Sequence, residues 1–229
     1  MQPNKLHNAN EILTRIKRGR CSPELHFFRV ASSGKNHTNM KMNFVSLTTF
    51  VVILASSVFA QVPFLGRCPA VTVQRNFVPN NYLGDWFEHK KYFAIFQAGG
   101  TCVTAKYTDN GNGVVGVLNR QFNPLTKRYS TIMGTAELNN KESGEAKLSV
   151  RFPTVGNFPA NYWVLGTDYS SYSVVWSCTD LLFLNFQFAW VLTRDRNPSQ
   201  GTLQAADEVL KRNGVSIRAF TETSQTNCP

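Results

Sequence analysis

The sequence lacks the spacings on which many enzymes and metal sites depend. Among 229 residues it holds four histidines and five cysteines, with no C-x-x-C, G-x-S-x-G or H-E-x-x-H pattern. Those patterns are typical of zinc and thiol-redox sites, serine hydrolases and zinc proteases. Asp168 and His89 have no visible catalytic partner, and we expect Asp168 to accept hydrogen bonds within a turn. We therefore predict no catalytic residue and no metal site.

Charge is scarce, since only 17% of the residues are Asp, Glu, Lys or Arg. The net charge of +10 comes mostly from residues 1–60, where eight Lys and Arg face two acidic residues. Beyond residue 60 no basic cluster is interleaved with aromatic residues, which is the pattern expected of a nucleic-acid surface. We predict no nucleic-acid partner.

No apolar run reaches the roughly 20 residues that a membrane-spanning helix needs. The longest one, residues 44–59, follows Lys41 and ends in small residues, which is typical of a secretory signal peptide. We expect a signal peptide over residues 40–60, cleavage after Ala60, and a secreted, extracellular domain over residues 61–229. Residues 1–39 read as a prefix outside the working protein; the competing interpretation is a cytoplasmic tail ahead of a signal anchor.

Cysteine usage agrees with export. Cys21 lies in the prefix, which leaves an even number in the remainder: Cys68, Cys102, Cys178 and Cys228. Secreted domains commonly pair such cysteines, so we expect two disulfides. Four cysteines allow three pairings, and their spacing does not choose among them.

Short segments of alternating polarity, separated by turn residues, predict an all-β domain. In Lys147 to Phe152 the alternation is strict, so Leu148, Val150 and Phe152 share one face. The eight predicted strands are 86–93, 102–108, 114–122, 127–138, 146–152, 162–167, 172–178 and 186–193. A helix over 203–213, capped by Thr202, should pack outside the sheet, and a short strand is expected over 215–217.

A glycine-rich stretch from Gly111 to Gly116 matches G-x-G-x-x-G. A dinucleotide site requires a helix after this motif, but the residues that follow are β-branched and strand-like. We interpret Asn110-Gly111 or Asn112-Gly113 as a hairpin turn. No cofactor is predicted from it.

Three separated motifs define the family resemblance. They are Gly84-Asp85-Trp86, Thr167-Asp168-Tyr169 and Arg194. In this order they resemble the lipocalin family, which implies an eight-stranded antiparallel up-and-down barrel with one C-terminal helix packed outside. It also implies that Gly84, Trp86, Thr167, Asp168, Tyr169 and Arg194 meet at the closed end, with the arginine over the tryptophan ring.

Within that family, the chain from Cys68 to Pro229 resembles apolipoprotein D and its insect relatives, Lazarillo and the bilin-binding proteins. The resemblance rests on residues 82–86, 162–169, 175–179, 188–194 and 227–229. It implies disulfides Cys68–Cys178 and Cys102–Cys228. It also implies that Tyr107, Asn119, Phe152 and Trp190 line a ligand pocket.

Alternation along the last predicted strand adds Phe188 and Leu192 to the face of Trp190. For Trp163 two positions are possible: its side chain either lines the pocket or belongs to the barrel wall. An inward amide is costly unless it is hydrogen-bonded, so we expect Asn119 to orient a ligand carbonyl or hydroxyl. The alternative for Asn119 is a strand shifted by one residue, with its side chain in water.

We therefore predict a non-enzymatic, secreted carrier of one small hydrophobic ligand: a lipid, a steroid- or retinoid-like molecule, or a bilin pigment. The alternative is a secreted protective or interaction protein whose barrel is filled by its own side chains. A third possibility is a lipocalin-type enzyme, which would need a free thiol in the pocket.

One apolar stretch consists of Leu181, Leu182, Phe183 and Leu184. We expect it to contact a lipid surface, a lipoprotein particle or a second protomer. The alternative is that it folds over as a lid or extends a strand. No feature of the sequence indicates an oligomeric state.

Overall fold

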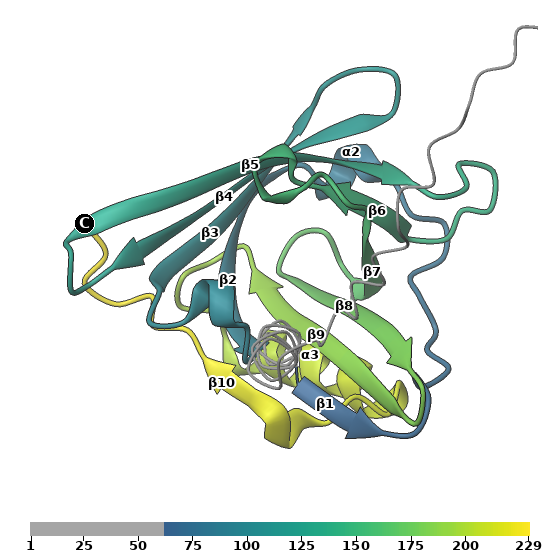
Figure 1. Ribbon diagram of the computed structural model, residues 1–229. Helices are drawn as coiled ribbons and strands as arrows, with labels where there is room; N and C mark the ends of the chain where they lie inside the picture. The colour runs from purple at the N-terminus through teal and green to yellow at the C-terminus, as the bar shows by residue number, and fades with distance from the viewer. Residues whose placement is uncertain (1–61) are drawn as a thin grey trace, which may run out of the picture. The chain divides into compact units, whose positions relative to one another are not determined.

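The computed structural model describes residues 62–229 (Figure 1). The expected prefix, signal peptide and cleavage position, together with Cys21, lie outside the described residues. Within the described part no helix is long and apolar enough to cross a membrane.

Eight antiparallel strands make up the barrel wall. They are β2 (Gly84–Tyr92), β3 (Thr101–Asp109), β4 (Val114–Asn123), β5 (Arg128–Leu138), β6 (Lys147–Arg151), β7 (Ala160–Thr167), β8 (Tyr172–Leu181) and β9 (Leu184–Thr193). Each pairs with the next along the chain, and β9 pairs back with β2, which closes the sheet on itself. The eight-stranded barrel predicted from the sequence is confirmed.

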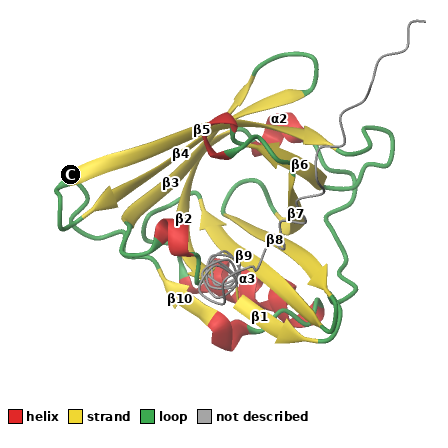
Figure 2. Ribbon diagram, in the orientation of Figure 1, coloured by secondary structure: helices red, strands yellow, loops and turns green. Residues whose placement is uncertain are grey.

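Two further strands lengthen the sheet. β1 (Val62–Leu65) pairs with β9, and β10 (Phe220–Glu222) pairs with β2 (Figure 2). The lead, residues 62–83 ahead of the barrel, contains β1 and the short helix α2 (Pro79–Tyr82). The strand expected over 215–217 is wrong: Val215 is buried in the core outside the barrel wall, and the strand forms five residues later.

The C-terminal helix α3 spans Gln200–Arg212 and lies against β7 and β8 (Figure 2). It begins before the expected Leu203 because Ser199, not Thr202, is its cap: the Ser199 hydroxyl accepts from the Thr202 amide at 3.1 Å. Ala206, Val209 and Leu210 are buried on the face turned to the sheet, as the periodicity predicted.

The described chain has two apolar clusters, one on each side of the barrel wall. The inner cluster lies inside the barrel and includes Trp86 and Tyr107. The outer cluster lies around α3, with Val209 and Leu210 packed near Trp176 of β8. A strand with both faces buried in this way needs apolar residues at consecutive positions, as in Val174 to Trp176.

Two disulfides attach the ends of the domain to the wall. Cys68 of the lead is bonded to Cys178 of β8, and Cys102 of β3 to Cys228 of the tail. All four cysteines in the described chain are therefore paired. Each bond closes a long loop, and cross-links of this kind stabilise by about 2–5 kcal/mol.

Candidate functional site

One end of the barrel is sealed by Arg194 and Trp86. The Arg194 guanidinium lies 3.7 Å from the centre of the Trp86 ring, and Trp86 is completely buried. A cation over an indole face contributes about 0.5–2 kcal/mol. Three guanidinium nitrogens also donate to backbone carbonyls of two chain segments, at 2.8 Å to Asp85 and 2.9 Å to Leu83 around the start of β2, and at 2.9 Å to Tyr169 in the turn between β7 and β8. The expected arginine–tryptophan contact is thus present.

Gly84 makes this close approach feasible. Its φ is +97°, in the region that favours glycine. A Cβ at Gly84 would stand 3.2 Å from Nη1 of Arg194, tighter than an ordinary contact. Glycine is therefore required here both by backbone conformation and by the packed arginine.

The turn between β7 and β8 supports the same end. Asp168 accepts hydrogen bonds from the amides of Ser170, Ser171 and Tyr172, as expected of a turn residue, and also from the Ser171 hydroxyl. Burial raises the pKa of Asp168, but these donors outweigh it, so the pKa is lower than usual. Asp168 acts as a structural group in this turn.

Above Trp86, buried hydroxyls form a connected floor. Tyr82 bonds to Ser173 at 2.8 Å and to Tyr162 at 3.0 Å, and Tyr162 bonds to Tyr107 at 2.7 Å. Burial raises the pKa of Tyr82 to about 12, and it also raises the pKa values of Tyr107 and Tyr162 well above the usual value for tyrosine. These phenols stay neutral near neutral pH, and the buried Tyr107 has its hydroxyl engaged by Tyr162.

The inner wall becomes less buried toward the opposite end. Asn119 of β4 pairs with Ala105, a member of the inner cluster, so its side chain faces the interior and not water. Its Oδ1 atom is buried and has no hydrogen-bond partner. An unpaired buried acceptor is costly, so this oxygen is available to a donor from an occupant of the barrel.

Aromatic residues cover the wall around this oxygen. Phe152 and Trp190 are partly buried against the inner cluster, and Leu192 belongs to it. Phe188 stacks on Trp190 with ring centres 5.5 Å apart. The structure thus brings Asn119, Phe152, Phe188, Trp190 and Leu192 to one inner surface.

Trp163 does not join this surface. It packs against the outer cluster, 5.8 Å from Trp176, with Lys147 over its ring. Of the two alternatives left open by the sequence, the wall is the correct one. The reason is alternation, since Tyr162 and Val164, on either side of Trp163, both belong to the inner face of β7.

Sequence reasoning missed a polar group inside the wall. The carboxylate of Glu88 is buried and accepts from Lys91 Nζ and Thr223 Oγ1, both at 2.6 Å. Its other oxygen accepts from Gln97 Nε2 at 2.7 Å, and Gln97 Oε1 accepts from Trp190 Nε1 at 3.2 Å. Alternation from Trp86 already places Glu88 on the inner face, so a signal for it was present.

The opposite end of the barrel is a mouth rimmed by apolar side chains. Its hairpin loops carry Phe93, Ile95, Phe96, Leu125, Val155, Phe158, Leu181, Leu182 and Phe183, all exposed. Leu182 and Phe183 are 84% and 71% exposed and form the two-residue tip between β8 and β9. The apolar stretch from Leu181 to Leu184 therefore forms the end of the β8–β9 hairpin. Its last residue, Leu184, lies on β9 opposite Leu65 of β1.

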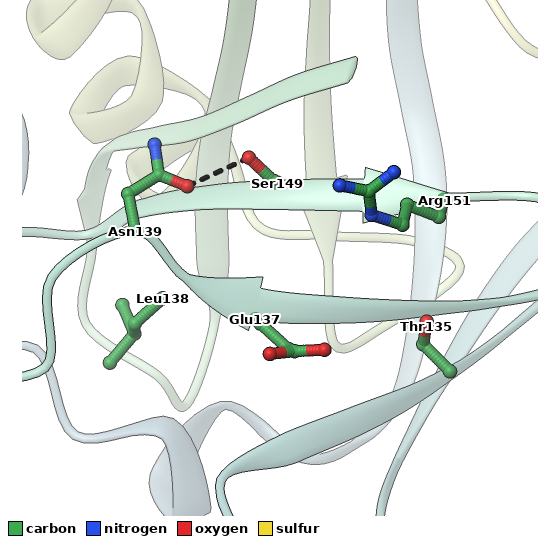
Figure 3. A pocket seen from close by; sticks show the side chains of 6 residues that line it. All are labelled: Thr135, Glu137, Leu138, Asn139, Ser149 and Arg151. Atoms are coloured by element: carbon green, nitrogen blue, oxygen red, sulfur yellow. Dashed lines mark hydrogen bonds between the residues drawn. The ribbon is translucent and has the colours of Figure 1, made fainter. Parts of the chain in front are cut away.

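Two surface pockets lie outside this inner surface. One, of about 220 Å³, is lined on β5 and β6 by mainly polar side chains such as Glu137, Ser149 and Arg151 (Figure 3). The other, of about 310 Å³, lies between the β2–β3 loop and the C-terminal tail and includes Lys91 and Gln97. Across the described residues no three metal-ligating side chains come together.

Comparisons with known proteins agree with this architecture. Residues 79–225 match the family model described as a lipocalin-like domain. Apolipoprotein D of Mus musculus is 39% identical over 167 residues, covering 72% of this chain and 86% of that protein. Lazarillo protein of Schistocerca americana is 33% identical over 192 residues, covering 82% and 87% respectively.

Solved structures share the fold. Lobster apocrustacyanin A1 superposes with a TM-score of 0.62 at 24% identity, over 73% of this chain and 93% of its own. Insecticyanin from the tobacco hornworm Manduca sexta gives 0.63 at 23% identity, over 73% and 90%. With the sealed end, the closed barrel and the sequence relatives in agreement, the chain belongs to the lipocalin family.

Proposed function

We propose that this protein is a secreted carrier that binds one small hydrophobic molecule inside the barrel, with no catalytic role. Members of the lipocalin family bind small hydrophobic ligands. The observation that carries the proposal for this chain is the buried, unpaired Oδ1 of Asn119, set in an otherwise apolar and aromatic wall. Pockets of this composition, with few polar groups that fix orientation, are typical of ligand sites.

The site we propose is the mouth-side half of the interior. Asn119, Phe152, Phe188, Trp190 and Leu192 would contact the ligand, while Tyr107 closes the floor below it. Because Oδ1 accepts hydrogen bonds, the preferred partner is a ligand hydroxyl or N–H group. A lipid, a steroid- or retinoid-like alcohol and a bilin are the classes to test.

Tryptophan fluorescence titration tests the carrier function, since Trp190 lies in the wall of the proposed site. Biliverdin, retinol, a fatty acid and a steroid should be titrated in parallel, and at least one should quench saturably. Mass spectrometry of solvent extracts from natively purified protein would identify the natural occupant. If no ligand binds saturably and none is extracted, the filled-barrel alternative replaces this proposal.

A substitution at Asn119 tests the polar contact separately. Asn119→Leu keeps a similar volume but removes the acceptor, so a hydroxylated ligand should bind about tenfold more weakly, the equivalent of one hydrogen bond. Asn161→Leu, at an exposed position on β7, is the matched control and should leave affinity unchanged. Equal affinities in both variants would remove Asn119 from the site.

Secretion is supported by the two disulfides of the described domain and by the signal-like segment read from the sequence. Expression in a secreting cell should release a protein whose N-terminus, read by Edman sequencing, is Gln61. A start at any earlier residue would contradict cleavage after Ala60.

A lipid-surface contact through the β8–β9 tip is a second candidate function. It is favoured by the exposure of three consecutive apolar residues, Leu181, Leu182 and Phe183. Flotation with phosphatidylcholine liposomes should carry the wild type upward and leave Leu182→Ser with Phe183→Ser behind. Equal flotation of the two proteins would contradict lipid contact by this tip.

A further inference from the structure

The side chain of Gln97 occupies a polar position inside the barrel mouth, beside the aromatic wall of the proposed ligand site. Gln97 belongs to a short 3-10 turn, Ile95–Gln97, in the loop between β2 and β3. Its carboxamide reaches inward and joins two groups of the inner wall, Glu88 on β2 and Trp190 on β9. These two strands are direct neighbours in the barrel.

The two wall groups have opposite hydrogen-bonding character. A carboxylate only accepts and an indole N–H only donates. Nε2 of Gln97 therefore donates to Glu88 Oε2 at 2.7 Å, and Oε1 accepts from Trp190 Nε1 at 3.2 Å. The protein thus presents one acceptor and one donor, spaced so that a single carboxamide satisfies both.

Glu88 is held in this position by other groups. Its side chain lies on the same inner face as Trp86, and its other oxygen takes hydrogen bonds from Lys91 and Thr223. Both Glu88 and Lys91 are buried, so the carboxylate keeps its place if Gln97 moves away. The acceptor is therefore preformed by the wall and does not depend on the mouth loop.

Gln97 is held less firmly than its partners. The neighbouring Phe96 contacts Phe188 edge-on, with ring centres 5.6 Å apart, but Phe96 itself remains exposed. The loop also lines the surface pocket of about 310 Å³, and Gln97 is one of the residues that border this space. A ligand that offers the same pair of hydrogen bonds could exchange with it at small net cost.

We propose that Glu88 Oε2 and Trp190 Nε1 form a head-group site for neutral ligands with an adjacent hydrogen-bond donor and acceptor, of which a carboxamide is the simplest. Gln97 fills this site in the structure and leaves it when such a ligand enters. The inference rests on the proposed carrier function, since the apolar remainder of the ligand lies along Phe188 and Trp190. An ionised carboxylate head is rejected because it meets the Glu88 carboxylate.

Three ligands with the same hydrocarbon chain test the head-group preference: oleamide, methyl oleate and oleate, measured by isothermal titration calorimetry at neutral pH. Oleamide offers both donor and acceptor, methyl oleate only the acceptor, and oleate a negative charge. We expect oleamide to bind about tenfold more tightly than methyl oleate, because it makes one more hydrogen bond. Oleate should bind most weakly of the three.

Removing the occupant tests the role of Gln97. Gln97→Ala should tighten oleamide binding about tenfold, because the site no longer has to be vacated, while methyl oleate changes less. Gln204→Ala, on the exposed face of α3, is the matched control and should bind all three ligands like the wild type. Trp190→Phe keeps an aromatic wall but lacks the N–H from which both oleamide and methyl oleate would accept, so it should weaken the two ligands alike and leave the preference for oleamide, which comes from Glu88, in place.

The outcomes separate this inference from the carrier function. If oleamide and methyl oleate bind equally in the wild type and in Gln97→Ala, the head-group site is wrong while the carrier function stands. If oleamide is preferred but Gln97→Ala does not tighten it, Gln97 is not the occupant. If none of the three binds either protein, the carrier proposal for lipids fails, and the head-group site fails with it.

Discussion

At the closed end of the barrel, backbone carbonyls converge on one arginine, whereas at the mouth large apolar side chains extend into solvent. Arg194 satisfies carbonyls from two chain segments and covers a fully buried Trp86. At the mouth, Phe158 and Leu182 are 79% and 84% exposed. The difference shows that the two ends serve different purposes: one is built for stability, and the other leaves contacts unmade.

Between the two ends, the interior changes from filled to accessible. The hydroxyls of the floor satisfy one another through Tyr82, Tyr107 and Tyr162. Farther up, the Asn119 oxygen has no partner, and Trp190 is only partly buried. A ligand would therefore find its unsatisfied contacts in the mouth-side half, and substitutions should separate the two halves by their effect on stability.

The largest effect is expected from Trp86→Ala at the closed end. Removing a fully buried tryptophan leaves a cavity and should lower the free energy of unfolding by about 3–5 kcal/mol. Phe158→Ala, which truncates an exposed aromatic at the mouth, is the control and should change it by less than about 0.5 kcal/mol. Denaturant unfolding followed by circular dichroism measures both, and similar losses would contradict the contrast between the ends.

Arg194→Lys should have the next largest effect. Lysine keeps the positive charge but not the planar fork that reaches several carbonyls and lies over the indole. We expect a loss of about 1.5–3 kcal/mol, the scale of hydrogen bonds to a charged group. Arg128→Lys, at an exposed position near the mouth, is the matched control and should be neutral. If both variants unfold at the same denaturant concentration, Arg194 does not seal the barrel.

The sequence predicts the closed end better than the mouth, for a physical reason. Gly84, Trp86 and Arg194 each have one role set by backbone geometry and burial, so their motifs identify the arrangement directly. The strand order and the positions of Phe188 and Leu192 follow from alternation in the same way. These features can be predicted because each depends on a local sequence pattern or on the packing of the closed end.

Features that depend on pairing across the fold were harder to predict. Trp163 could not be placed until the register of β7 was known, and β1 pairs with the part of β9, Leu184 to Gln187, that does not pair with β2. The link from Glu88 to Gln97 and Trp190 joins β2, the β2–β3 loop and the distant strand β9, and no local sequence pattern predicts it. The strand after α3 was misplaced because the apolar Val215 packs in the outer cluster and does not belong to a strand.

The smallest effect on stability is expected at the β8–β9 tip. A negligible effect there would mark the clearest difference between the mouth and the closed end of the barrel. Leu182→Ser with Phe183→Ser removes two exposed side chains that contribute little to the core, so the free energy of unfolding should stay within about 0.5 kcal/mol of the wild type. The amide of Gly66 donates to the backbone oxygen of Phe183, and this bond is kept by serine. If the double variant unfolds much earlier, the tip is a structural element, and any loss of liposome flotation would reflect unfolding. If stability is kept while flotation is lost, the apolar residues of the mouth serve contact with another surface.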